Sequence, residues 1–258
     1  MSFEIIILLS LIQGITEFLP VSSSAHLMLF PFLAKVVDQG VVTDIFAHIG
    51  SLLAVILFYR NDLKSIILSI FSPKKNKNML YCIIIATLPI VFVGLLFLIF
   101  KIDIRNPKIV IYTSIIFGLM LFITDKFGKK KYLLKNLSLK DAFYIGVAQT
   151  LASIPGVSRS GITTTCGLSL GYKREDTLKF SFLISIPAII LVGCGGILKF
   201  IVEPQPIDFS SMIYVMLFSF IFSFMAIRFM VYLLKHSSFK PFAIYRILLG
   251  IFLYLYLK

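Results

Sequence analysis

The sequence predicts an all-α integral membrane protein, an inverted-topology repeat of six transmembrane helices and two re-entrant helical hairpins. Three observations predict this fold. First, 59% of the 258 residues are hydrophobic and only 14% are charged, whereas a soluble domain is about 45–50% apolar and about 25% charged. Second, long apolar runs alternate with short basic loops. Third, two shorter apolar regions, 1–35 and 141–170, are broken by proline and serine.

The two broken regions are predicted to be re-entrant hairpins. Each arm has about 12–15 residues and is therefore about 18–22 Å long as a helix. A hydrocarbon core of about 30 Å is too thick for such an arm to cross. Irregular backbone at membrane depth is tolerated only against protein or a wet cavity. We therefore expect the two hairpin tips to meet near mid-membrane and to line a cavity.

Six segments are long and apolar enough to span the membrane, or nearly so. They are residues 41–59, 79–100, 108–124, 178–200, 209–234 and 242–257. Pro89 and Pro187 lie inside two of them and are expected to kink these helices rather than end them, because neighbouring groups can satisfy the freed backbone.

Loop charges orient the chain. With the 60–78 loop placed inside, which includes Lys74, Lys75 and Lys77, the inner loops carry 15 lysines and arginines and the outer side carries six. The positive-inside effect then places both termini outside. The net charge of +13 reflects this topology, and no nucleic-acid partner is expected.

The order of the elements predicts a single membrane domain, 1–258, made of two repeats. Repeat 1 covers about 1–124 and repeat 2 about 141–258, each with one hairpin followed by three spans. Because three is odd, the second repeat inserts upside down relative to the first. Secondary transporters share this architecture, so the repeat by itself leaves transport open.

The predicted tips carry polar groups that a bilayer tolerates poorly, and such groups indicate a functional site. The first tip has Glu17, Ser22, Ser23, Ser24 and His26, and the second has Ser158, Arg159, Ser160 and Thr163. Arginine binds phosphate with a planar fork, and hydroxyls and helix N-termini add further donors. Glu17 is a candidate metal ligand or base, and His26 a candidate proton carrier. This set suits phosphoryl transfer on a lipid-linked phosphate.

Two stretches resemble the motifs of one family. They are Gln13-x-x-x-Glu17-Phe-Leu-Pro-Val-Ser-Ser-x-x-His26 and Pro155-Gly-x-Ser-Arg159-Ser-Gly-x-Thr163. They resemble the two signature motifs of the undecaprenyl pyrophosphate phosphatases of the bacitracin-resistance type, over essentially the whole chain. The resemblance implies hydrolysis of undecaprenyl diphosphate to the monophosphate and inorganic phosphate, which recycles the lipid carrier for peptidoglycan and confers bacitracin resistance. It also implies a divalent cation, Mg²⁺ or Ca²⁺, and a site facing the outer side of the bacterial inner membrane.

The resemblance assigns roles residue by residue. Glu17, His26 and Arg159 match the family's essential positions, and Ser23 matches the proposed nucleophile. The positions that match phosphate contacts are Ser22, Ser158, Ser160 and Thr163. Gln13 stands where many members have a second glutamate. A two-carboxylate metal site is therefore not expected, and Glu17 would hold the ion with Gln13 as a second candidate for the metal or the substrate.

Several alternatives stay open at this point. Ser23 could attack phosphorus with His26 as base, or His26 or Glu17 could activate water while Arg159 neutralises the transition state. A lipid flippase or secondary transporter on the same scaffold is the competing class. The expected partners are a polyprenyl diphosphate and membrane lipids, and a homodimer is left open.

Three further ionisable residues are not assigned to the catalytic group. Asp44 and His48 lie one helical turn apart, so they either pair with each other or shape the outer mouth. Arg246 lies within about two turns of the inner surface and is expected to snorkel to it.

Overall fold

A computed structural model describes the chain except for residues 35, 37, 72–77, 101, 103, 105, 203–207 and 258, and except for the side chain of Lys199. Lys74, Lys75 and Lys77, which contribute to the predicted inner face, therefore lie outside the described residues. The described part is helical, with no strand beyond an isolated bridge between Tyr132 and Tyr172. The prediction of an all-α protein is confirmed.

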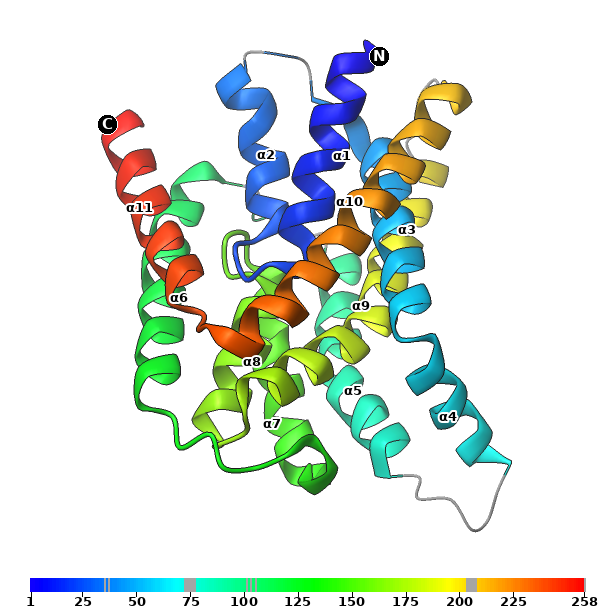
Figure 1. Ribbon diagram of the computed structural model, residues 1–258. Helices are drawn as coiled ribbons and strands as arrows, with labels where there is room; N and C mark the ends of the chain where they lie inside the picture. Colours follow the sequence, from blue (N-terminus) through cyan, green and yellow to red (C-terminus); the bar gives the residue numbers. More distant parts are fainter. Residues whose placement is uncertain are drawn as a thin grey trace.

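The helices follow one another in the order shown in Figure 1. They are α1 (Phe3–Phe18), α2 (Ser23–Ala34), α3 (Gly40–Phe58), α4 (Arg60–Ile70), α5 (Asn78–Ile99), α6 (Pro107–Phe127), α7 (Leu139–Thr150), α8 (Arg159–Ser169), α9 (Arg174–Val202), α10 (Phe209–His236) and α11 (Lys240–Tyr256). Short 3-10 turns occupy Leu134–Asn136 and Leu151–Ser153.

Within the described ranges, five helices are long and apolar enough to cross a membrane: α3, α5, α6, α9 and α10. The sixth predicted span is α11, whose 17 residues reach only the lower end of the spanning range of about 17–25. Pro89 and Pro187 lie inside continuous helices, α5 and α9, as predicted. The protein is a multi-pass membrane protein.

Helix α4 was not predicted, because its region was assigned to an inner loop. It is an 11-residue helix on which Arg60 is exposed and Ile67 is 54% exposed. Its Asp62 accepts from Lys179 Nζ at 2.6 Å, which ties α4 to α9. Apolar and charged residues at helical spacing favour a short helix that lies at a membrane interface instead of crossing it.

Two pairs of short helices form the hairpins. The arms have 16 and 12 residues in α1 and α2, and 12 and 11 residues in α7 and α8. In Figure 1 the α1–α2 hairpin enters from the end of the molecule that holds both termini, and the α7–α8 hairpin enters from the opposite end, near α4. The two tips come together in the middle of the bundle.

Each hairpin packs its first arm on a long helix from the other half of the chain. Helix α1 lies against α10, and α7 lies against α5. Glycines allow these close approaches. A Cβ on Gly14 would lie 2.5 Å from Phe222 Cβ, and one on Gly146 would lie 2.5 Å from the Ala86 carbonyl oxygen. The two halves therefore interlock around the tips. Behind the first tip, Phe18 and Phe182 pack edge to face at 5.2 Å in the buried core.

Candidate active site

The two tips line a cavity of about 500 Å³. Its polar lining consists of Thr16, Glu17, Ser22, Ser23, Ser24, His48, Gln149, Ser153, Ser158 and Arg159. Apolar residues of α5 and α9, from Ile90 and from Ala188 onward, also line it. The cavity therefore combines a cluster of polar groups with an apolar lining from two long helices.

A second cavity of about 600 Å³ continues from the first and shares Ser24, His48 and Ser153 with it. It reaches Asp38 before α3 and Pro107 at the start of α6. These helix ends lie on the side of the molecule that carries both termini, so the polar pocket opens toward that side (Figure 1).

Both tips turn at a serine in the left-handed region. Ser22 has φ 76° and Ser158 has φ 68°, in a conformation that costs a non-glycine residue about 1–3 kcal/mol. Each serine then caps the helix that follows. Ser22 Oγ accepts from the Ala25 amide at 3.4 Å, and Ser158 Oγ accepts from the Gly161 amide at 3.1 Å. Helices α2 and α8 thus begin at the cavity, where the amides of a helix N-terminus attract an anion.

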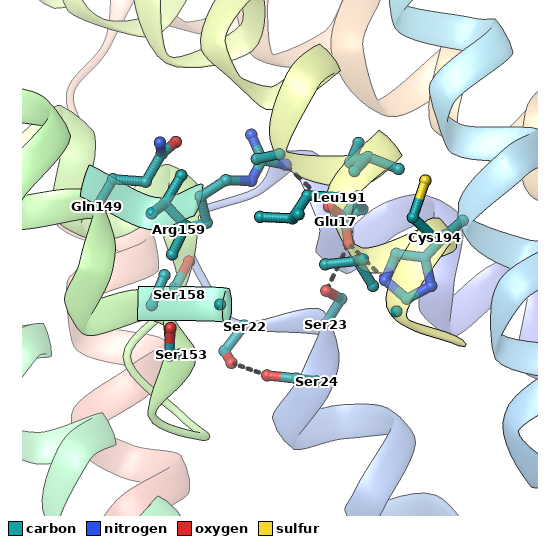
Figure 2. A pocket seen from close by; sticks show the side chains of 18 of the residues that line it. Glu17, Ser22, Ser23, Ser24, Gln149, Ser153, Ser158, Arg159, Leu191 and Cys194 are labelled. Atoms are coloured by element: carbon teal, nitrogen blue, oxygen red, sulfur yellow. Dashed lines mark hydrogen bonds and ion pairs between the residues drawn. The ribbon is translucent and has the colours of Figure 1, made fainter. Parts of the chain in front are cut away.

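Glu17 joins the two tips. Its Oε2 accepts from Ser23 Oγ at 2.6 Å and from Gln13 Nε2 at 3.2 Å. Its Oε1 accepts from Arg159 Nη2 at 2.8 Å. Figure 2 shows Ser23 and Arg159 pointing toward Glu17 from opposite tips. Because only 8% of Glu17 is exposed, this pair of opposite charges lies largely out of water, where a charge needs such a partner.

Arg159 also donates to the Ser181 carbonyl on α9, at 3.4 Å from Nη1. These two contacts use only part of a guanidinium that has five N–H donors. Since the side chain lines the cavity, the remaining donors are available to an anion there.

The structure does not bring His26 to Ser23. In the described part of the chain, His26 Nδ1 contacts the Ser22 carbonyl at 2.7 Å and Nε2 contacts Tyr245 Oη at 2.6 Å. A carbonyl only accepts, so Nδ1 carries the proton and Nε2 accepts from Tyr245. His26 is not among the residues that line the cavity. Its contacts hold the strained turn at Ser22.

Comparison with known proteins identifies the family. Residues 6–252 match the sequence model of the bacitracin resistance protein BacA. The chain belongs to the BacA family. It is 39% identical over 260 residues to the undecaprenyl-diphosphatase of Alcanivorax borkumensis, with 97% of each chain covered. It is 40% identical over 255 residues to that of Alteromonas mediterranea, with 96% of each covered. It is 37% identical over 264 residues to undecaprenyl-diphosphatase 1 of Pseudoalteromonas translucida, covering 100% of this chain and 99% of the relative.

Two BacA motif residues that were predicted to contact phosphate make hydrogen bonds to backbone carbonyls in this structure. Ser160 Oγ donates to the Leu19 carbonyl at 2.9 Å and so links the second tip to the first. Thr163 Oγ1 donates to the Arg159 carbonyl at 2.8 Å and lies 2.8 Å from Ser181 Oγ. Each is 2% exposed, and neither lines the cavity, whereas Ser22 and Ser158 do.

The sequence analysis did not predict that His48 lies beside Glu17. Its Nε2 lies 3.7 Å from Glu17 Oε2, and its Nδ1 lies 2.7 Å from the Asp44 carbonyl. One turn further along α3, Ser51 Oγ accepts from Gln13 Nε2 at 3.3 Å. The i, i+3 spacing of His48 and Ser51 on a predicted span was the available signal, because it places two polar side chains on one face of an apolar helix.

The prediction that Arg246 snorkels is wrong. Its side chain is fully buried, and Nη2 donates to the Gly156 carbonyl at 2.7 Å and to the Val157 carbonyl at 2.8 Å. Carbonyls of the second tip therefore hold this arginine inside the bundle through Nη2, while its buried Nε and Nη1 have no hydrogen-bond partner in the described structure. Tyr245, the preceding residue on α11, holds the first tip through His26.

A cation is compatible with the oxygen atoms near Glu17. The described residues contain no group of three or more His, Cys, Asp and Glu side chains that could enclose an ion. Gln13, however, is fully buried, and its Oε1 has no hydrogen-bond partner in the described structure. Its Nε2 now faces Glu17, and rotation of the amide would turn Oε1 toward the carboxylate, which would give two oxygen donors for a hard divalent cation.

Proposed function

We propose that the protein hydrolyses undecaprenyl diphosphate to undecaprenyl phosphate and inorganic phosphate, which recycles the lipid carrier for peptidoglycan and confers bacitracin resistance. One observation carries the proposal. The Ser23 hydroxyl donates to Glu17, and Glu17 is paired with Arg159, in a cavity that apolar residues of α5 and α9 also line. This arrangement supports a substrate whose diphosphate binds at the tips and whose polyprenyl chain lies against α5 and α9.

In the mechanism that we favour, Ser23 is the nucleophile and Glu17 is the base. Ser23 Oγ forms a bond to the terminal phosphorus, its proton passes to Glu17 Oε2, and the bond from phosphorus to the bridging oxygen breaks. Undecaprenyl phosphate leaves with that oxygen. Water then attacks the phosphoserine, the P–Oγ bond breaks, and Glu17 returns a proton to Ser23 Oγ. Arg159 and the amides at the starts of α2 and α8 stabilise the charge on the transferred phosphoryl group.

In this mechanism, His26 is a positioning residue that holds the turn at Ser22 and takes no proton from Ser23. It has no contact with Ser23 or Glu17 in the described structure, whereas Glu17 Oε2 is 2.6 Å from Ser23 Oγ. A general base must lie within about 2.6–3.2 Å of the heavy atom whose proton it takes, or reach it through one water. Glu17 meets this requirement.

The cofactor in this proposal is a divalent cation, Mg²⁺ or Ca²⁺. Glu17 and Gln13 would hold it together with substrate oxygens, and when bound it would neutralise charge on the diphosphate. Neither ion requires a complete cage of protein ligands, because Mg²⁺ keeps several waters.

We also propose that the chain is an inverted repeat of the two halves predicted from the sequence, with the site on the outer side of the bacterial inner membrane. Helix α1 packs on α10 and helix α7 packs on α5, so each hairpin contacts the other half of the chain, and this supports the repeat. The opening of the cavities toward the end that carries both termini supports an outward-facing site if the positive-inside effect places the termini outside. A homodimer stays a prediction.

The orientation is tested by cysteine labelling. In a variant that lacks Cys82, Cys166 and Cys194, Ser2→Cys should react with an impermeant thiol reagent on spheroplasts, and Asn136→Cys should react only after the membrane is opened. Labelling of Asn136→Cys alone in closed spheroplasts would reverse the orientation.

The activity is tested with protein purified in detergent and supplied with undecaprenyl diphosphate. We expect release of inorganic phosphate and, after acid quenching during turnover, phosphate bound to Ser23. Hydrolysis without a phosphoserine would replace the serine route by direct attack of water. The absence of phosphate release, with lipid moved across vesicle membranes, would support the flippase alternative.

A further inference from the structure

His48 places an imidazole nitrogen beside the carboxylate at the centre of the site. Nε2 lies 3.7 Å from Glu17 Oε2, and both side chains line the same cavity. Two donors that share one metal ion at about 2.1 Å lie about 3.0–3.4 Å apart for angles between octahedral and tetrahedral. A small rotation of either side chain would shorten the distance between Nε2 and Oε2 from 3.7 Å to this range.

The other ring nitrogen of His48 is already fixed. Nδ1 lies 2.7 Å from the Asp44 carbonyl, and because a carbonyl only accepts, Nδ1 carries the proton. In the neutral ring the lone pair is then on Nε2, which faces Glu17. Histidines that bind metals almost always donate their other N–H to a carbonyl or a carboxylate in this way. The ring is therefore held in the tautomer and orientation of a ligand.

Arg159 pairs with the other carboxylate oxygen, Oε1, so Oε2 is the oxygen that faces His48. Oε2 also accepts from Ser23 Oγ at 2.6 Å, and a cation bound at Oε2 would replace this contact. Gln13 donates to Oε2 through Nε2, while its buried Oε1 has no partner among the described residues. The second cavity also reaches His48, and its lining includes Asp38 and Asp44.

We propose that His48 is a metal ligand and that Nε2 takes the place of the carboxylate that Gln13 lacks. The site then has one nitrogen and one carboxylate ligand, completed by substrate oxygens and water. Imidazole favours transition metals, whereas Mg²⁺ and Ca²⁺ prefer oxygen ligands alone. The site therefore prefers Mn²⁺ to Mg²⁺ or Ca²⁺. This inference rests on the proposed function, because it assigns the cation of that same site.

The test measures metal binding by spectroscopy. Protein purified in detergent, with its affinity tag removed, is titrated with Mn²⁺ in the presence of methylenediphosphonate, a diphosphate that is not hydrolysed. Electron paramagnetic resonance reports free Mn²⁺, and pulsed measurements report ¹⁴N nuclei coupled to the bound ion. The wild type is compared with His48→Asn, which removes the imidazole, and with the matched control His236→Asn at the exposed end of α10.

We expect Mn²⁺ in the wild type to couple to one imidazole nitrogen and to bind at least about 10-fold more tightly than Mg²⁺. His48→Asn should remove the coupling and weaken Mn²⁺ binding by at least about 10-fold, because even groups that only orient a ligand change affinity by about 10–100-fold. His236→Asn should change neither. Bound Mn²⁺ without ¹⁴N coupling, coupling that survives in His48→Asn, or no Mn²⁺ binding at millimolar concentration would each overturn the proposal.

Failure of this inference is separate from failure of the proposed function. If the wild type releases phosphate but its Mn²⁺ shows only oxygen ligands, the phosphatase stands and His48 has another role. If the wild type releases no phosphate from undecaprenyl diphosphate, the proposed function fails whatever the spectra show.

Discussion

The two hairpin tips share one backbone design and carry different chemistry. Ser22 and Ser158 both turn in the left-handed region, and both cap the helix that follows. Each lies 3.2–3.3 Å from the hydroxyl of the serine two residues later. A glutamine nine residues earlier, Gln13 or Gln149, is fully buried with an unpaired Oε1 in the described structure.

The difference lies in the residue that follows each turn. The first tip has Ser23 there and the second has Arg159. Equivalent positions thus present a nucleophile from one side and a guanidinium from the other to the same cavity. The comparison teaches that the repeated backbone supplies the anion-binding geometry, while one side chain in each copy determines its part in the chemistry.

The largest expected effect is that of Ser23→Ala on the first tip. Removal of the attacking hydroxyl should lower kcat by about 10⁴-fold or more, as the loss of a nucleophile does in serine enzymes. Phosphate release measured at saturating lipid provides the check. Because the variant also loses the hydrogen bond to the Glu17 carboxylate, the free energy of unfolding should fall by up to about 1.5–3 kcal/mol, and activity is compared at a temperature at which both proteins are folded. Retention of more than a tenth of the activity would assign attack to water.

Arg159→Lys tests the second tip. The charge is kept, but an ammonium group cannot donate at once to Glu17, to Ser181 and to phosphate with the geometry of the guanidinium fork. We expect kcat/KM to fall by about 10²–10³-fold, the usual loss when one preorganised donor is removed. Near-normal turnover would show that the second tip contributes charge alone and that its fork has no function.

The tips also differ in what holds them from behind. Arg246 holds the second tip, and Arg246→Met should leave the Gly156 and Val157 carbonyls unpaired. Each buried carbonyl that loses its partner costs about 1–3 kcal/mol. We expect a lower thermal unfolding temperature in detergent and a raised KM, because Ser158 and Arg159 lose their fixed positions. Arg246→Lys, which retains a donor, should recover part of both losses. Equal KM values in all three proteins would restrict Arg246 to stability.

Gln13→Glu and Gln149→Glu compare the two buried glutamines. Only Gln13 contacts Glu17, so only Gln13→Glu should add a carboxylate to the cation site and lower the half-saturating Mg²⁺ concentration, by about 10-fold. Gln149, which donates to the Ala86 carbonyl, serves as the matched control. Equal metal dependence in the two variants would assign Gln13 to substrate positioning.

Tyr245→Phe should have the smallest effect. It removes the 2.6 Å hydrogen bond to His26 behind the first tip, which contributes about 0.5–1.5 kcal/mol. We expect a small fall in the unfolding temperature and at most a few-fold loss of activity. A loss as large as that in Ser23→Ala would instead place His26 and Tyr245 in the proton-transfer path.

The sequence predicted the elements whose signal is local. Long apolar runs indicated α3, α5, α6, α9 and α10, and the short broken runs indicated the hairpins, because bilayer thickness sets both lengths. Helix α4 was missed because its apolar residues are too few for a span and its charges are typical of a loop.

The candidate site was predicted only in part, for a similar reason. Glu17, Ser23 and Arg159 lie in two recognisable motifs, and the structure brings them together. The direction in which His26 points could not be predicted, because it depends on Tyr245, which lies 219 residues away on a helix without a motif. Arg246 was misplaced for the same reason, since its partners belong to the second tip.

The interlocked packing of the two halves has a consequence for biogenesis. Arg159, the partner of Glu17, lies 142 residues further along the chain. At about 5–20 residues per second, the ribosome takes about 7–28 s to synthesise that interval. During this time the first hairpin has neither its ion-pair partner nor the surface of α10 on which α1 packs. A nascent chain arrested before the second half should therefore expose a carboxylate at membrane depth and become a substrate for membrane quality control, whereas two separately expressed halves should rescue each other.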